Sequence, residues 1–336
     1  MRAFATGASG TRPGSSRWGA QRPDPGPRGP RPSAPGARRR TADEDAALEV
    51  LHLPAHGEPA GPPVLLVHGI CHGAWCWRDN YAPFFAQHGY DVHVLSLRGH
   101  GGSAGREALD QAGLEDYAAD VLAVVRDLPH PPVVVGHSMG GALVQMVVPR
   151  SPGSFAGAVL LASMVPGGFR PSELVRSFRS PRGQLALLRL NAGRRLSPGA
   201  TARLPFFGGR LSPDYAASIA PLLQPESRRA TRELLRFTVP GGSFPVPLLV
   251  LGSRQDAYFG ETAATRTARH YGVEPVLVDN CCHDLMLDPE WPIGAGIIRA
   301  WLTSTFTAEP PGERTSQQAE QPTAAPSHAR SPGSPS

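Results

Sequence analysis

The chain has 336 residues, of which 40% are hydrophobic, and a formal net charge of +5. This length and apolar content predict at least one domain with a sizeable buried core and exclude a wholly disordered chain. The first forty residues hold nine arginines and one aspartate, a net charge of +8, so the remainder carries −3. The basic charge therefore lies outside the part expected to fold, and we expect no nucleic-acid partner.

The two ends differ in composition from the middle. Residues 1–45 are rich in Gly, Pro, Ser and Arg and show neither a helical nor a strand-like apolar period, which predicts a disordered arm. Residues 307–336 have the same character and predict a disordered tail. Neither a signal peptide nor an apolar membrane span is recognisable. Oligomeric state is left open.

Cysteine usage bears on the compartment. The chain has four cysteines, and their spacing is not that of a disulfide framework. We therefore expect a reducing compartment and a cytoplasmic location. The four are Cys71, Cys76, Cys281 and Cys282.

Between residues 46 and 306, short apolar runs alternate with helical segments. The runs are near-continuously apolar, as parallel strands covered on both faces require. This alternation predicts an α/β fold with a doubly wound, mostly parallel sheet. Strands are expected at 63–67, 92–96, 132–135, 158–161, 246–251 and 275–278, with an edge strand at 48–53, and helices at 81–88, 114–128, 141–148, 261–271 and 292–305.

The alternation of strand-like runs and helical segments stops between about residues 166 and 244. Arg- and Leu-rich helical pieces replace it, expected at 173–178, 184–191 and 228–237. We interpret this segment as a helical cap inserted over the carboxyl edge of the sheet.

A G-x-S-x-G motif, residues 136–140, lies between the strand at 132–135 and a helix. A serine on such a tight turn is held out above the sheet, and flanking glycines leave room for close neighbours. Ser138 is therefore the predicted nucleophile. A serine hydroxyl is a poor nucleophile at neutral pH, so a general base must accompany it.

With this motif in place, residues 50–305 resemble the α/β-hydrolase superfamily. The resemblance implies the order nucleophile, acid, base along the chain. Asp256 follows a late strand as the orienting acid, and His283 follows the last strand as the base. Asp279 and Asp284 remain alternative acids.

The loop from His68 to Trp77 is similar to that of plant-type methylesterases and hydroxynitrile lyases, and more loosely to that of cofactor-free haloperoxidases. The resemblance implies an oxyanion hole built from the backbone N–H groups of Ile70 and Met139. Hydroxynitrile lyases of this branch use a lysine near the triad, and this chain contains none. Epoxide hydrolases and haloalkane dehalogenases carry an aspartate at the position of Ser138. The missing lysine and this serine therefore disfavour all three of these activities.

Several aromatic side chains and one histidine are candidates for a substrate pocket under the cap. They are Trp75, Trp77, His137, Phe169 and Tyr258, with Phe206 and Phe207 beside them. The loop residues His68, Cys71, His72 and Cys76 have metal-ligand side chains, but consecutive loop residues point different ways. We expect neither a metal nor an organic cofactor.

The sequence therefore predicts a serine hydrolase that cleaves a small-to-medium carboxylic ester, thioester or lactone through an acyl-enzyme. One alternative is a hydrolase-fold protein that binds or senses a small molecule with little turnover. Another is perhydrolase or haloperoxidase-like chemistry at the same site.

Overall fold

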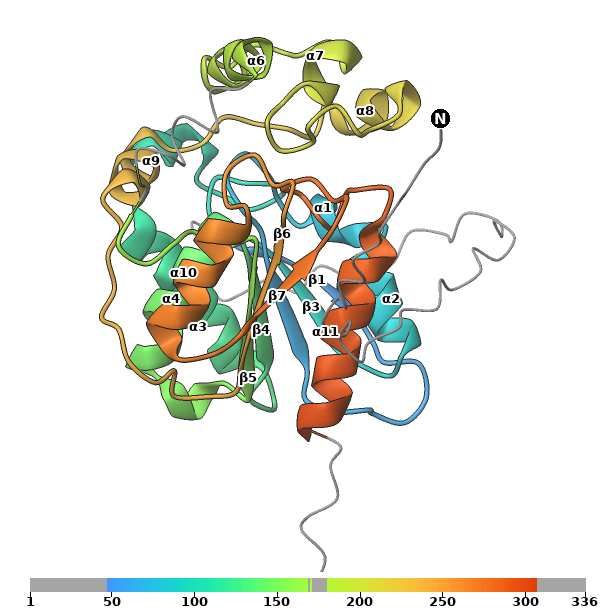
Figure 1. Cartoon of the computed structure of the whole chain (residues 1–336), viewed down its shortest axis with the longest axis vertical. Helices are drawn as coiled ribbons and strands as arrows, with labels where there is room; N and C mark the ends of the chain where they lie inside the picture. Colours follow the sequence, from blue (N-terminus) through green and yellow to red (C-terminus); the bar gives the residue numbers. More distant parts are fainter. Residues whose placement is uncertain (1–46, 169, 171–179, 307–336) are drawn as a thin grey trace, which may run out of the picture. The chain divides into compact units, whose positions relative to one another are not determined.

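The computed structural model describes residues 47–168, 170 and 180–306 (Figure 1). The predicted arm and tail, the cap helix expected at 173–178 and the pocket candidate Phe169 lie outside the described residues. Within the described part, no helix has the length and hydropathy needed to cross a membrane.

A seven-stranded sheet forms the centre of the described chain, in the order β1-β3-β2-β4-β5-β6-β7. All neighbouring strands pair in parallel except β1, which runs antiparallel to β3 at one edge. The strands are β1 (Glu49–Leu53), β2 (Val64–Val67), β3 (Val92–Ser96), β4 (Val133–His137), β5 (Gly157–Leu161), β6 (Leu248–Ser253) and β7 (Pro275–Val278). The predicted fold class is confirmed.

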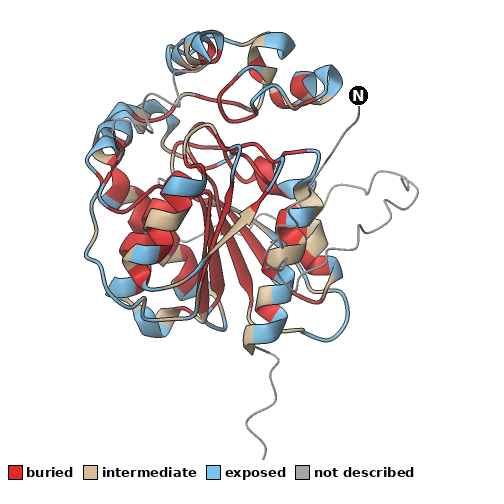
Figure 2. Ribbon diagram, viewed as in Figure 1, coloured by how far each residue is buried: buried red, intermediate tan, exposed pale blue. Residues whose placement is uncertain are grey.

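Helices cover both faces of this sheet (Figure 1). One face carries α1 (Trp75–Arg78), α2 (Tyr81–Gln87) and α11 (Trp291–Phe306), and the other α3 (Leu114–Asp127), α4 (Met139–Arg150) and α10 (Glu261–Tyr271). Every residue of β2, β3, β4 and β5 is buried, because helices pack on both sides (Figure 2). This explains why their sequences are mostly apolar runs, interrupted in β3 by His93 and Ser96.

Four further helices lie between β5 and β6: α6 (Pro181–Asn191), α7 (Pro198–Ala202), α8 (Pro213–Ile219) and α9 (Arg228–Leu235). Each begins after a serine whose hydroxyl accepts a backbone N–H from the first turn, and in three of them proline follows that serine. The helices expected at 184–191 and 228–237 are present, the first beginning three residues earlier and the second ending two residues sooner. Helices α7 and α8 were not predicted from the sequence.

Candidate active site

Ser138 occupies the turn between β4 and α4. Its backbone has φ 52° and ψ −111°, a left-handed conformation that a non-glycine residue adopts only at a cost. The neighbouring glycines are needed for space: a Cβ on Gly140 would lie 2.5 Å from the carbonyl oxygen of Val67, and one on Gly136 would overlap the carbonyl of Gly140. The chain therefore holds this serine on a strained turn at the carboxyl end of the strand.

Asp256 and His283 meet across two loops that follow β6 and β7. His283 Nδ1 lies 2.8 Å from Asp256 Oδ2, and both side chains are buried. The other carboxylate oxygen of Asp256 accepts the backbone N–H groups of Tyr258 and Phe259, at 2.6 and 2.9 Å. Asp256 can thus hold the proton of His283 on Nδ1 and leave Nε2 to accept another.

The surroundings of His283 shift its affinity for protons. Burial by itself lowers the pKa of His283, but the charge of Asp256 and the hydrogen bond to it outweigh burial, and Asp284 adds to them. The net result is a pKa above the ordinary histidine value. His283 is therefore a stronger base than a solvated histidine.

A small cavity of about 60 Å³ brings the candidate groups together. Ser138 and His283 line it, and so do Ile70 and Met139, whose backbone N–H groups the sequence analysis assigned to an oxyanion hole. The other lining residues are apolar or aromatic: Met164, Phe206, Leu234, Tyr258 and Phe259. Phe206 and Leu234 come from the segment between β5 and β6, so that segment closes part of the cavity.

Among the pocket candidates that the structure describes, Tyr258 and Phe206 line this cavity. Trp75 stacks on His72, with ring centroids 5.1 Å apart, and Trp77 meets His137 edge-on at 6.3 Å. His137 packs against His283 at 4.8 Å. These three side chains therefore lie behind the residues that line the cavity.

A buried ion pair under the site was not foreseen. His72 Nδ1 lies 2.6 Å from the carbonyl oxygen of Ile70 and its Nε2 lies 2.9 Å from Asp284 Oδ2. Each ring nitrogen of His72 therefore faces an oxygen that can accept a hydrogen bond. The pair links the loop of the proposed oxyanion hole to the residue after His283.

Asp284 also faces a second histidine. His137 Nε2 donates to the carbonyl oxygen of His283 at 3.1 Å and lies 3.5 Å from Asp284 Oδ1. Burial, and secondarily the charge of His283, lower the pKa of His137 to about 3, so this ring is neutral near pH 7. Burial alone raises the pKa of Asp284, but His72 and the other two histidines hold it below its ordinary value. The carboxylate hydrogen-bonded to His283 Nδ1 is that of Asp256, whereas Asp284, the alternative acid, contacts His72 and His137.

The comparison with protein families bears on the whole arrangement. Residues 64–292 match the model of the alpha/beta hydrolase family. The chain belongs to this family. The superfamily resemblance drawn from the motif order is thereby confirmed.

Known relatives of this α/β hydrolase include plant esterases. Methylesterase 3 of Arabidopsis thaliana is 33% identical over 105 residues, 31% of this chain and 40% of the relative. Esterase PIR7B of Oryza sativa subsp. japonica is 37% identical over 106 residues, 30% of this chain and 38% of the relative. The matched regions thus span about two fifths of each relative.

Solved structures share the fold over a greater length. A thermophilic esterase from Thermogutta terrifontis superposes with a TM-score of 0.57 at 21% identity, covering 80% of this chain and 98% of the other. A meta-cleavage product hydrolase from Pseudomonas fluorescens IP01 gives 0.60 at 15% identity, covering 77% and 95%. At these identities the likeness concerns the fold alone.

The segment between β5 and β6 is fastened to the α/β-hydrolase core by buried charge. Glu226 accepts the hydroxyl of Tyr117 at 2.9 Å, and its other oxygen lies 3.1 Å from His100 Nε2 and 3.3 Å from the backbone nitrogen of Cys71. Burial raises the pKa of Glu226, but the charge of His100 and the hydrogen bonds it receives keep it below the ordinary value. A second clamp joins Arg210 to buried Asp288 at 2.5 Å.

A larger cavity, of about 660 Å³, lies between α3, α4 and residues 236–245. None of Ser138, Asp256 and His283 lines it. Size alone therefore does not identify the candidate active site, which we place at the smaller cavity because Ser138 and His283 line it.

Proposed function

We propose that this α/β hydrolase is a serine esterase that cleaves a small-to-medium carboxylic ester, thioester or lactone through an acyl-enzyme on Ser138. The observation that carries the proposal is that Ser138, on its strained turn, and His283, bound to Asp256, line one cavity. The named esterases among the relatives agree with an ester substrate.

In the proposed reaction, His283 Nε2 takes the proton of the Ser138 hydroxyl as its oxygen attacks the substrate carbonyl carbon. The carbonyl oxygen becomes an oxyanion, which the N–H groups of Ile70 and Met139 stabilise. His283 then returns the proton to the leaving alcohol or thiol, and the acyl group stays on the serine. A water molecule, deprotonated by the same histidine, releases the carboxylic acid and restores Ser138.

The small volume of the cavity favours a substrate with a short or slender acyl group. About 60 Å³ holds only a few heavy atoms, and its walls are mostly apolar. A longer substrate requires the part contributed by Phe206 and Leu234 to move. Short-chain, aryl and lactone esters are therefore the first substrates to test.

Active-site labelling tests the proposal. We expect a fluorophosphonate to add one equivalent to the full-length wild type, measured by intact mass, and none to Ser138→Ala. A matched control is Ser163→Ala, because Ser163 is also a buried serine near α4 but its hydroxyl is engaged by Gln145 and by the carbonyl of Met164. Labelling of Ser138→Ala to the wild-type extent, or no labelling of folded wild type, would overturn the proposed mechanism.

A further inference from the structure

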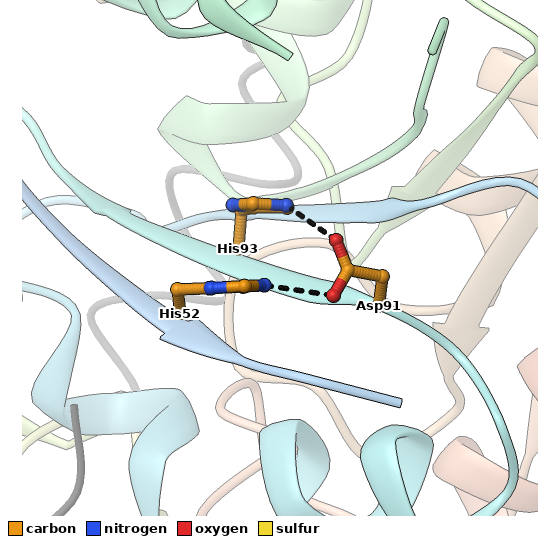
Figure 3. Close-up of side chains that lie close together, drawn as sticks. All are labelled: His52, Asp91 and His93. Atoms are coloured by element: carbon orange, nitrogen blue, oxygen red, sulfur yellow. Dashed lines mark hydrogen bonds and ion pairs between the residues drawn. The ribbon is translucent and has the colours of Figure 1, made fainter. Parts of the chain in front are cut away.

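A second group of reactive side chains lies at the outer edge of the sheet (Figure 3). His52 of β1 and His93 of β3 are directly opposite in the antiparallel pairing, and Asp91 comes just before β3. The two imidazole rings are stacked, with centroids 4.5 Å apart and planes 6° from parallel. Their Nε2 atoms lie 2.7 Å and 2.9 Å from the two carboxylate oxygens of Asp91.

We propose that His52, Asp91 and His93 bind a divalent metal ion of the zinc class. Imidazole nitrogen and carboxylate oxygen are the ligands that zinc takes alongside thiolate, at about 2.0–2.2 Å. Such bonds place tetrahedral donor atoms roughly 3.3 Å apart, and one donor atom from each of these residues already lies within 4.8 Å of the others. Small side-chain rotations therefore suffice to close the site.

Exposure leaves room for the rest of the coordination sphere. The side chain of His52 is 45% exposed and that of Asp91 is 34% exposed, whereas that of His93 is 11% exposed. Water can therefore complete four-coordination from the solvent side. Two neutral imidazoles and one carboxylate also offset only one of the two positive charges of the ion, which an open, solvated site tolerates.

The strand backbone makes the three ligands converge. His52 and His93 are neighbours in the ladder that joins β1 to the sheet, and they project from the same face. Among the described strands, β1 has only β3 as a partner, so the ion fastens an edge strand to its neighbour. Its role is stabilising, because β3 begins at this end whereas Ser138 follows the opposite, carboxyl end of β4.

One other group of histidine and acidic side chains converges within the described residues, formed by His137, His283 and Asp284. It belongs to the candidate active site, where Asp284 is paired with His72. The edge site shares no residue with it, so the two are separable by substitution.

Zinc titration of the full-length, tag-free protein under reducing conditions tests the proposal. We expect calorimetry to show that the wild type binds one equivalent of Zn²⁺. The variants His52→Gln and Asp91→Asn should bind zinc at least about tenfold more weakly than the wild type. His130→Gln is the matched control, because His130 is an exposed histidine elsewhere on the surface and its loss should leave that equivalent unchanged. His52 is exposed, so its variant should fold, which its zinc-free thermal unfolding verifies.

Thermal unfolding gives a second readout. Zinc at about a hundred times the wild-type dissociation constant should raise the Tm of the wild type by about 5 °C and that of His52→Gln by at most about half as much. Cobalt(II) in place of zinc should show the visible bands of a four-coordinate site in the wild type only. A wild type that binds no zinc, or one whose zinc affinity survives both substitutions, would mean that the cluster is a hydrogen-bonded ion pair and nothing more.

Discussion

The sheet and the segment between β5 and β6 differ in how far polar contacts add to apolar packing. The strands under the active site are wholly buried among apolar neighbours (Figure 2), whereas α6 and α9 expose leucines. These are Leu185, Leu188 and Leu235. The segment nevertheless packs into the core through apolar side chains such as Phe206 and Leu234, and polar clamps attach it in addition; in the Glu226–His100 clamp both side chains are buried. The strands are thus held by apolar packing, whereas the covering segment combines apolar packing with a few buried charges.

The largest effect should come from removing the charge of the main clamp. Glu226→Gln replaces an acceptor oxygen with an NH₂ group that faces other donors, including the backbone nitrogens of Cys71 or Ser227. Removing one partner from a buried charge network costs about 3–5 kcal/mol. We expect the free energy of unfolding, measured by urea denaturation, to fall by roughly that amount.

The control for this variant is Glu115→Gln, which makes the same change in an exposed pair with Arg150. Its cost should stay below about 1 kcal/mol, because exposed ion pairs contribute little. Glu226→Gln should also become more sensitive to proteolysis between residues 180 and 236, since the clamp lies in that segment. Equal stability of the two variants would contradict the idea that buried charge attaches the segment.

The contrast between the two regions also explains what could be predicted from sequence. Ser138, Asp256 and His283 each follow a strand, and the carboxyl ends of parallel strands meet at one edge, so their positions along the chain indicate a shared site. In the structure His283 is hydrogen-bonded to Asp256 and lines one cavity with Ser138, and their catalytic roles stay predictions. The direction of the Asp284 side chain depends on which loop packs beside it, and neighbouring residues in the chain do not reveal that.

The helices of the covering segment show the same limit. α7 and α8 have five and seven residues, too few for a periodic apolar pattern. Each begins with a serine followed by proline, at Ser197 and Ser212, and this pattern, typical of a helix N-terminus, could have indicated them. Glu226 lies between helices and gave no signal, because only the folded chain brings it to His100 and Tyr117.

The second prediction concerns the His72–Asp284 pair, which joins the loop after β2 to the loop after β7. Asp284 contributes to the raised pKa of His283, after Asp256. A general base acts when neutral, so a raised pKa moves the loss of activity on acidification to higher pH. Asp284→Asn removes a negative charge near His283, and the acid limb of kcat/KM should therefore shift to lower pH.

The matched control is Asp279→Asn, in the same loop but 66% exposed and paired with Arg254. Its pH profile should coincide with that of the wild type, because solvent screens an exposed charge. Asp284→Asn should in addition lower kcat, since His72 loses its carboxylate while it remains bonded to the carbonyl of Ile70. An unchanged acid limb in Asp284→Asn would show that the pair does not influence the base.

The smallest expected effect concerns Tyr258, which lies in the loop after β6 and lines the small cavity together with residues of the covering segment. This side chain lines the catalytic cavity, and its buried hydroxyl has no hydrogen-bond partner among the described residues. A buried, unsatisfied hydroxyl costs about 1–3 kcal/mol, a cost that a substrate with a suitably placed acceptor atom removes on binding. Tyr258→Phe should therefore raise KM several-fold for esters that carry a second oxygen in the acyl group and change little for plain alkyl esters. Since the variant no longer buries an unsatisfied hydroxyl, its free energy of unfolding should equal or slightly exceed that of the wild type. Paired kinetics on the two substrate types decide the matter: an equal KM change for both would assign Tyr258 to packing around His283 and not to substrate recognition.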